Sequence, residues 1–199
     1  FEKAFNLNIV HSSIAGFRDQ LRQAGSPLYE ALKKSLRCGS FIHADETGWN
    51  VDGKNYWLWK FSNKRACVSH IDQSRGQKVV DEIIGNEYNG IIISDFLSAY
   101  NKIGAKGKQR CLVHLLRDLK KVRRYWHDDK EVLHYIHRLK KIIEDAIELH
   151  KQYRGKPWDQ DYFNSRAFLE SAIKDFAFPN PNKRVLKRFA NRLARHREE

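Results

Sequence analysis

Hydrophobic residues recur near the start of the chain at the spacing of an α-helix. One apolar stripe consists of Leu28, Ala31, Leu32 and Leu36. We expect its helix to begin at Ser26-Pro27, because proline suits the first turn of a helix. Ser12-Ser13 is expected to cap an earlier helix that runs to about Ala24. Residues 1–40 are therefore predicted to be a helical lead-in.

From Phe41 the pattern is typical of β-strands. Three short strands are predicted at residues 41–45, 56–61 and 66–71. Val51-Asp52-Gly53-Lys54 contains the Asp-Gly signal of a tight hairpin, so the first two strands should pair antiparallel. Aromatic residues alternate onto one face of the second strand, which we interpret as core rather than as a base-stacking surface: Trp57, Trp59 and Phe61.

The next segments alternate between helix and strand. They are predicted as a helix over 78–84 closed by Gly85, a strand over 90–95, a short helix through Tyr100, a strand over 109–113 and a helix over 114–124. The strand over 90–95 is an unbroken apolar run, as in buried parallel strands. From Asp129 onward only amphipathic helices are predicted.

This order of elements is that of a ribonuclease H-like α/β fold. We expect a mixed sheet of three antiparallel strands followed by two parallel strands, with flanking helices and a C-terminal helical insertion. A right-handed crossover would place the fourth strand beside the first and parallel to it. The predicted divisions are a lead-in over 1–40, a catalytic core over 41–126 and a helical insertion region over 127–199.

Charge separates the two halves of the chain. The net charge is +13, of which residues 1–100 carry +1 and residues 101–199 carry +12. A basic half beside a neutral half favours a polyanionic partner, most commonly nucleic acid, although a solvated lysine-rich surface explains it equally well. The three cysteines include no Cys-x-x-Cys pair, and no apolar run is long enough to span a bilayer.

Two aspartates carry the candidate chemistry. Asp45 ends the first predicted strand and Asp95 ends the fourth. If these strands are parallel neighbours, both carboxylates lie at the strand ends where active sites of open sheets form. Such a pair suits Mg²⁺ or Mn²⁺, and two ions could serve the attacking and leaving oxygens of a phosphodiester. The alternative is that each aspartate only caps its turn.

Alternation along the first predicted strand divides the residues next to Asp45 between the two faces of the sheet. Glu46 should point away from the face of Asp45, while His43 shares that face and is a candidate to hold a metal-binding carboxylate in place, or else a structural histidine. His114 begins a helix and is the other candidate for a supporting role, in which it could contact a phosphate. With Cys111 it forms a Cys-x-x-His spacing that lacks the partner pair of a zinc site.

Basic residues on the helix over 114–124 form the candidate DNA contact. Four share one face at i, i+3, i+4 and i+7 spacing: Arg117, Lys120, Lys121 and Arg124. Arg75, in the turn Ser74-Arg75-Gly76, is a weaker candidate. A solvated face is the alternative explanation.

Four ordered segments resemble the insertion-sequence-66 family of DDE transposases. They are His43-Ala44-Asp45-Glu46-Thr47-Gly48-Trp49, Ser74-Arg75-Gly76, Ser94-Asp95-Phe96 with Ser98-Ala99-Tyr100, and Arg110-Cys111-Leu112-Val113-His114-Leu115-Leu116-Arg117-Asp118. The resemblance runs from about Phe5 to the end of the chain. It implies a ribonuclease H-like catalytic domain that acts on transposon-end DNA with Mg²⁺, with Asp45 and Asp95 as the first two acids of the family's triad.

The family's third acid lies in an Asn-Asn-x-x-Glu-Arg segment, which this sequence lacks. With Phe1 at its start and no methionine, the chain is expected to be a fragment, inactive alone, with the third acid beyond Glu199. The expected function is hydrolysis and strand transfer at transposon ends by a bacterial, cytoplasmic, nucleoid-associated enzyme. Its expected partners are double-stranded transposon and target DNA and further copies of itself. A nuclease without strand transfer and a non-catalytic DNA-binding remnant are the alternatives.

Overall fold

The computed structural model describes residues 10–177, 181 and 183–196. The chain divides into two compact units, Phe1–Lys108 and Gln109–Glu199, which are described separately.

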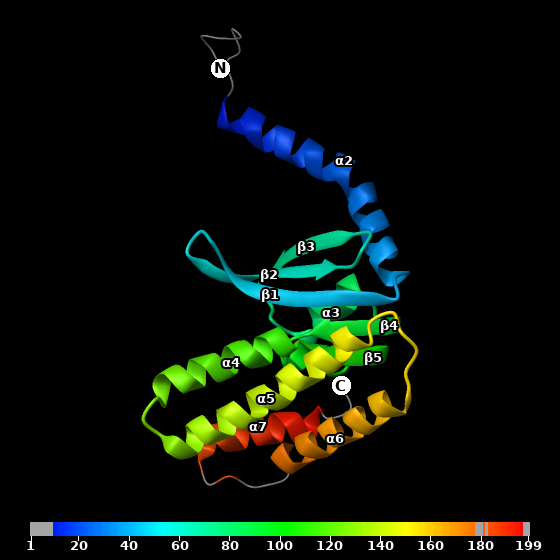
Figure 1. Ribbon diagram of the computed structural model, residues 1–199. Helices are drawn as coiled ribbons and strands as arrows, with labels where there is room; N and C mark the ends of the chain where they lie inside the picture. The colour runs from blue at the N-terminus through cyan, green and yellow to red at the C-terminus, as the bar shows by residue number, and fades with distance from the viewer. Residues whose placement is uncertain (1–9, 178–180, 182, 197–199) are drawn as a thin grey trace, which may run out of the picture. The chain divides into compact units, whose positions relative to one another are not determined.

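The first unit is built around a five-stranded sheet. Its strands are β1 (Phe41–Val51), β2 (Lys54–Ser62), β3 (Cys67–Asp72), β4 (Glu87–Ser94) and β5 (Gly104–Arg110), in the spatial order β3-β2-β1-β4-β5 (Figure 1). β1 and β3 each pair antiparallel with β2, and β1 pairs parallel with β4. The predicted ribonuclease H-like arrangement is confirmed, because the crossover returns the fourth strand to the side of the first.

The β1–β2 hairpin forms at the predicted Asp-Gly turn. Val51 pairs with Lys54, and the two residues between them, Asp52 and Gly53, have φ values of 49° and 74°. A two-residue turn with both φ values positive matches the right-handed twist of the flanking strands, and Asp-Gly tolerates it well.

The bounds of three strands differ from the prediction. β4 covers Glu87–Ser94 rather than 90–95, so Asp95 lies just after it. β1 does not end at Asp45 but continues to Val51, because pairing with β2 extends along the whole hairpin. β5 covers Gly104–Arg110 rather than 109–113. Its lysine-rich sequence hides it, since an edge strand tolerates charged side chains. The apolar Leu112 and Val113 belong to the following helix instead.

The two helices expected before residue 40 are one helix, α2 (His11–Arg37), with Pro27 inside it. Proline removes one backbone hydrogen bond and bends a helix without always ending it. The α2 ribbon bends along its length (Figure 1), and the Ser26 hydroxyl donates to the Arg22 carbonyl in the turn before the proline. The end of α2 is attached to the sheet, where the Tyr29 hydroxyl donates to the Ser69 carbonyl of β3.

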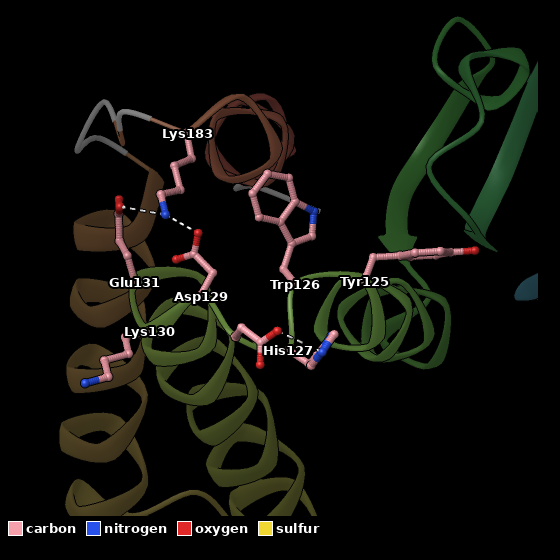
Figure 2. Close-up of a pocket in the computed structure, with 8 residues that line it drawn as sticks. Tyr125, Trp126, His127, Asp129, Lys130, Glu131 and Lys183 are labelled. Atoms are coloured by element: carbon pink, nitrogen blue, oxygen red, sulfur yellow. Dashed lines mark hydrogen bonds and ion pairs between the residues drawn. The ribbon is translucent and has the colours of Figure 1, made fainter.

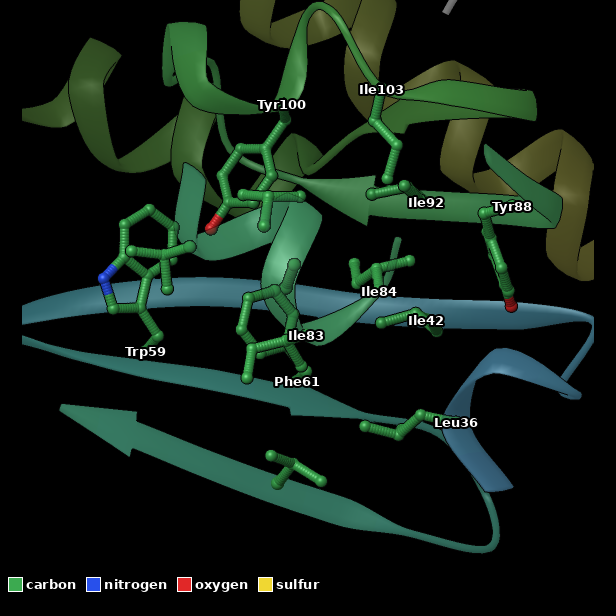
Figure 3. Packing of buried hydrophobic residues seen from close by; sticks show 14 of the residues in the cluster. Leu36, Ile42, Trp59, Phe61, Ile83, Ile84, Tyr88, Ile92, Tyr100 and Ile103 are labelled. Carbon is green, nitrogen blue, oxygen red and sulfur yellow. The ribbon is translucent and has the colours of Figure 1, made fainter. Parts of the chain in front are cut away.

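One hydrophobic core holds the first unit together. The predicted helix α3 (Gln77–Ile83) packs its buried residues against the sheet face formed by Ile42, Trp59, Phe61 and Ile92 (Figure 3). Trp59 and Phe61 are fully buried, which confirms the core interpretation of the β2 aromatics for these two. Tyr100, at the end of the 3-10 helix η1 (Ser98–Tyr100), belongs to the same core.

The second unit is helical. Its elements are α4 (Leu112–Tyr125), α5 (Lys130–Gln152), α6 (Gln160–Ala177) and α7 (Arg184–Arg195). Asp129 caps α5 by accepting from the Val132 amide, and its carboxylate also pairs with Lys183. Figure 2 shows Lys183 between Asp129 and Glu131, so one lysine links the start of α7 to the start of α5. None of the helices in the described part of the chain is long and apolar enough to cross a membrane.

Candidate functional site

The parallel register of β1 and β4 brings the two candidate aspartates to corresponding positions. The last pair of this ladder is Ala44 with Ser94, and Asp45 and Asp95 directly follow these two residues in the sequence. The Glu46 amide donates to Asp45 Oδ1 at 3.0 Å, and the Leu97 amide donates to Asp95 Oδ1 at 2.8 Å. Both carboxylates are thereby oriented by a backbone amide just after them.

Glu46 is the most buried carboxylate of this region, with a side chain that is only 1% exposed. Its Oε1 accepts two hydrogen bonds from the Arg75 guanidinium, at 2.8 and 3.2 Å. Its Oε2 accepts from the Tyr100 hydroxyl at 2.9 Å. A buried carboxylate needs such partners, because an unpaired charge in the interior is very costly.

The turn that carries Arg75 is fixed on both sides. The Trp59 indole donates to the Ser74 carbonyl at 3.1 Å, and the Asp72 carboxylate accepts from the Ser74 amide. The Arg75 guanidinium stacks over the Trp57 ring at 4.1 Å from its centroid. Because Gly48 and Glu46 of β1 lie opposite Trp57 and Trp59 of β2, the stacked arginine is directed towards Glu46.

The electrostatics of the site agree with this geometry. Burial raises the pKa of Glu46, the hydrogen bond from Arg75 opposes that effect, and the charge of Asp95 adds to it. Burial also raises the pKa of Tyr100 strongly, and the negative charges of Glu46, Asp95 and Asp45 raise it further. Three carboxylates therefore lie close enough to one tyrosine hydroxyl to affect it.

The alternation expected along β1 is present. Ile42, Ala44 and Glu46 face the core, whereas His43 and Asp45 are exposed. The expectation missed that the inward face also belongs to the site. A charged residue that continues the buried positions of Ile42 and Ala44 signals polar partners, here the half-exposed Arg75 and the buried Tyr100. His43 makes an edge contact with Phe41, with ring centroids 5.4 Å apart.

The predicted basic face of α4 lies in the second unit, and its four residues are exposed: Arg117, Lys120, Lys121 and Arg124. His114 occupies the first turn of α4, where its amide donates to the carbonyl of Cys111, the N-cap residue.

A second basic helix lies beside α4. Arg192 of α7 pairs with Asp118 of α4 at 2.7 Å. Lys121 and Arg188 line the same groove of about 240 Å³ between the two helices. Three arginines of α7 are exposed at helical spacing: Arg184, Arg188 and Arg195. The basic faces of α4 and α7 therefore adjoin across this groove, an extension that was not predicted from the sequence.

Within residues 10–177, 181 and 183–196, no group of three or more His, Cys, Asp or Glu side chains is arranged to hold a metal ion. Asp45 and Asp95 nevertheless offer hard carboxylate oxygens of the kind that Mg²⁺ and Mn²⁺ prefer. Mg²⁺ commonly binds through one or two carboxylates and completes its coordination with water. The donor chemistry of this pair therefore fits such an ion.

The sheet order, with its parallel β1–β4 pair, places the chain in the ribonuclease H-like class of α/β folds. The model of the Transposase IS66 family matches residues 1–196, and the chain belongs to this family. No curated protein matches the chain.

Proposed function

We propose that this chain carries the catalytic carboxylates of a transposase that cuts transposon ends and joins the freed 3′ hydroxyl to target DNA. Membership of the family supports the transposase role. The observation that carries the chemical part is the register of β1 and β4, which brings Asp45 and Asp95 to corresponding positions directly after Ala44 and Ser94.

In this proposal Asp45 and Asp95 hold one or two divalent cations, Mg²⁺ or Mn²⁺. A cation bound there would polarise the phosphodiester and lower the pKa of an attacking water. The amides of Glu46 and Leu97 keep the two carboxylates oriented. We assign no described residue as the third acid of the triad. His43, on the Asp45 side of β1, is proposed to support the site, and His114 is proposed to contact a phosphate.

DNA is proposed to bind the helical unit through the basic face of α4. Arg117, Lys120, Lys121 and Arg124 are exposed, and their i, i+3, i+4 and i+7 spacing puts them on one helix face that can contact phosphates. The neighbouring arginines of α7 extend this surface across the groove lined by Lys121 and Arg188. Such contacts set affinity and orientation but read no sequence, so recognition of particular transposon ends needs further contacts.

A cleavage and joining assay tests the proposal. A transposase that contains this chain is incubated with labelled transposon-end DNA, target DNA and Mg²⁺ or Mn²⁺. We expect nicked ends and joined products, both lost on Asp45→Asn or Asp95→Asn. Asp52→Asn is the matched control, because Asp52 lies in an exposed turn whose positive φ asparagine also tolerates. Cleavage without joining would indicate a nuclease, and DNA binding without cleavage would indicate a non-catalytic remnant.

A further inference from the structure

The hydrogen-bonded ladder between β1 and β4 stops at Ala44 and Ser94, just before the two aspartates. Beyond that pair no strand pairing between β1 and β4 fixes the Asp45 backbone relative to Asp95. On its other side β1 remains paired with β2, where Asp45 lies opposite Lys60. The separation of the two carboxylates therefore depends on contacts beyond the β1–β4 ladder.

Glu46 supplies one such contact. It directly follows Asp45, and its Oε2 accepts from the Tyr100 hydroxyl at 2.9 Å. Tyr100 belongs to the turn after β4 that Asp95 begins. The Leu97 amide donates to Asp95, and the Tyr100 amide donates to the Leu97 carbonyl. A closed chain of contacts thus runs from Asp45 through Glu46, Tyr100 and Leu97 to Asp95.

We infer that Glu46 is a positioning residue which, held by Arg75 and Tyr100, fixes the strand position of Asp45 against the turn that carries Asp95. The inference rests on the proposed function, because it assigns the network a purpose at the metal-binding pair. It also assigns Arg75 to Glu46 in place of the DNA contact expected from the sequence.

The surroundings of Arg75 favour this inward role. Its guanidinium is held between the Trp57 ring and Glu46 Oε1. The turn around it is fixed by hydrogen bonds from Trp59 and to Asp72, so the side chain begins from a defined backbone. The same core seats Tyr100, whose ring packs edge-on against Trp59 at 6.1 Å between centroids. The network therefore ties Glu46 to groups that are themselves held by packing and hydrogen bonds, as the positioning of metal ligands requires.

Removing one hydroxyl tests the inference. Tyr100→Phe removes the hydrogen bond to Glu46 and keeps the ring in the core. Tyr88→Phe is the matched control, because Tyr88 is also buried and its hydroxyl donates to the Gly39 carbonyl at 2.7 Å, away from the aspartates. Binding of Mn²⁺ to the chain is measured from the electron paramagnetic resonance signal of the free ion. Thermal unfolding of each variant is measured alongside.

We expect Tyr100→Phe to weaken Mn²⁺ binding by about 10-fold, the lower end of the effect of removing an outer-shell partner. Tyr88→Phe should leave Mn²⁺ binding unchanged even if it lowers the melting temperature by a similar amount. Glu46→Gln should weaken Mn²⁺ binding at least as much as Tyr100→Phe. If Glu46→Gln does not fold, the comparison of Tyr100→Phe with Tyr88→Phe tests the inference by itself.

Two failures are distinguishable. If wild type binds Mn²⁺ and Asp45→Asn does not, but Tyr100→Phe and Tyr88→Phe both bind like wild type, the network is only structural and the positioning role is wrong. If the wild-type chain itself shows no Mn²⁺ binding that depends on Asp45, the metal site of the proposed function is wrong, and the positioning role is overturned with it.

Discussion

Ala44 and Ser94 are paired at the end of the parallel β1–β4 ladder, and each is followed directly by an aspartate. In a parallel sheet, residues that follow a paired position on both strands lie at the same end of the sheet, so this pairing places Asp45 and Asp95 at one end of β1 and β4. A shift of one residue between the strands would have turned one of the two side chains towards the opposite face.

Charge reversal on α4 should weaken DNA binding in a salt-dependent way. Replacing Lys120, Lys121 and Arg124 by glutamate removes three exposed cations from the proposed phosphate-binding face. Each phosphate contact contributes about one unit to the slope of log affinity against log salt concentration. The slope should therefore fall by about three, measured by fluorescence anisotropy with duplex DNA over a range of salt concentrations.

The control for this experiment lies on α5. Lys140, Lys141 and Lys151 are equally basic but already pair with acids on their own helix, so their replacement by glutamate should leave the slope almost unchanged. Reversal of Arg184, Arg188 and Arg195 tests the α7 part of the surface separately. Equal losses from the α4 and α5 variants would show that binding follows total charge rather than the α4 face.

The Asp129–Lys183 pair should stabilise the helical unit at neutral pH and lose this effect in acid. The hydrogen bond from Lys183, followed by that from the Val132 amide, lowers the pKa of Asp129. A lowered folded pKa means that the stabilisation is present above the unfolded pKa of about 3.9 and is lost as the pH falls through the lower folded value.

Asp129→Asn isolates the charge, because asparagine caps a helix as well as aspartate does. At neutral pH the variant should melt below wild type, and the two melting temperatures should converge as the pH falls through the folded pKa. A gap that stays constant into strong acid would show that the carboxylate charge is not responsible.

Truncation in the core should separate the two faces of the sheet. Ile42 is fully buried, so Ile42→Ala should cost about 2–5 kcal/mol of unfolding free energy. Ile91, on the adjacent strand, is 43% exposed, and Ile91→Ala should cost less than about 1 kcal/mol. Chemical denaturation of both variants measures the difference, and equal losses would contradict the assigned core face.

The arrangement of the sheet was predictable because its signals are local. The Asp-Gly hairpin, the apolar run over 90–95 and the handedness of the crossover together predict the order of the strands. Element ends were harder, because β1 extends past Asp45 through pairing with β2 and β5 is a lysine-rich edge strand without an apolar pattern. The expected divisions after residues 40 and 126 stay predictions.

The placement of Asp45 near Asp95 was predictable from the parallel pairing of the first and fourth strands, but the surroundings of the two aspartates were not. The link from Glu46 to Arg75 joins residues 29 positions apart, and the link from Glu46 to Tyr100 joins residues 54 apart. The local sequence pattern cannot predict such contacts. They form because β1, the turn before α3 and η1 meet at one end of the sheet. The contact between α4 and α7 is also a tertiary contact, so the local sequence did not predict it.

Titration of the chain with Mn²⁺ tests the central claim most directly, using wild type, Asp45→Asn, Asp95→Asn and the double variant. If both carboxylates hold the same ion, each single substitution should remove most of the binding, and the double variant should lose little more than either alone. Binding that survives each single substitution, or losses that simply add in the double variant, would contradict a shared site.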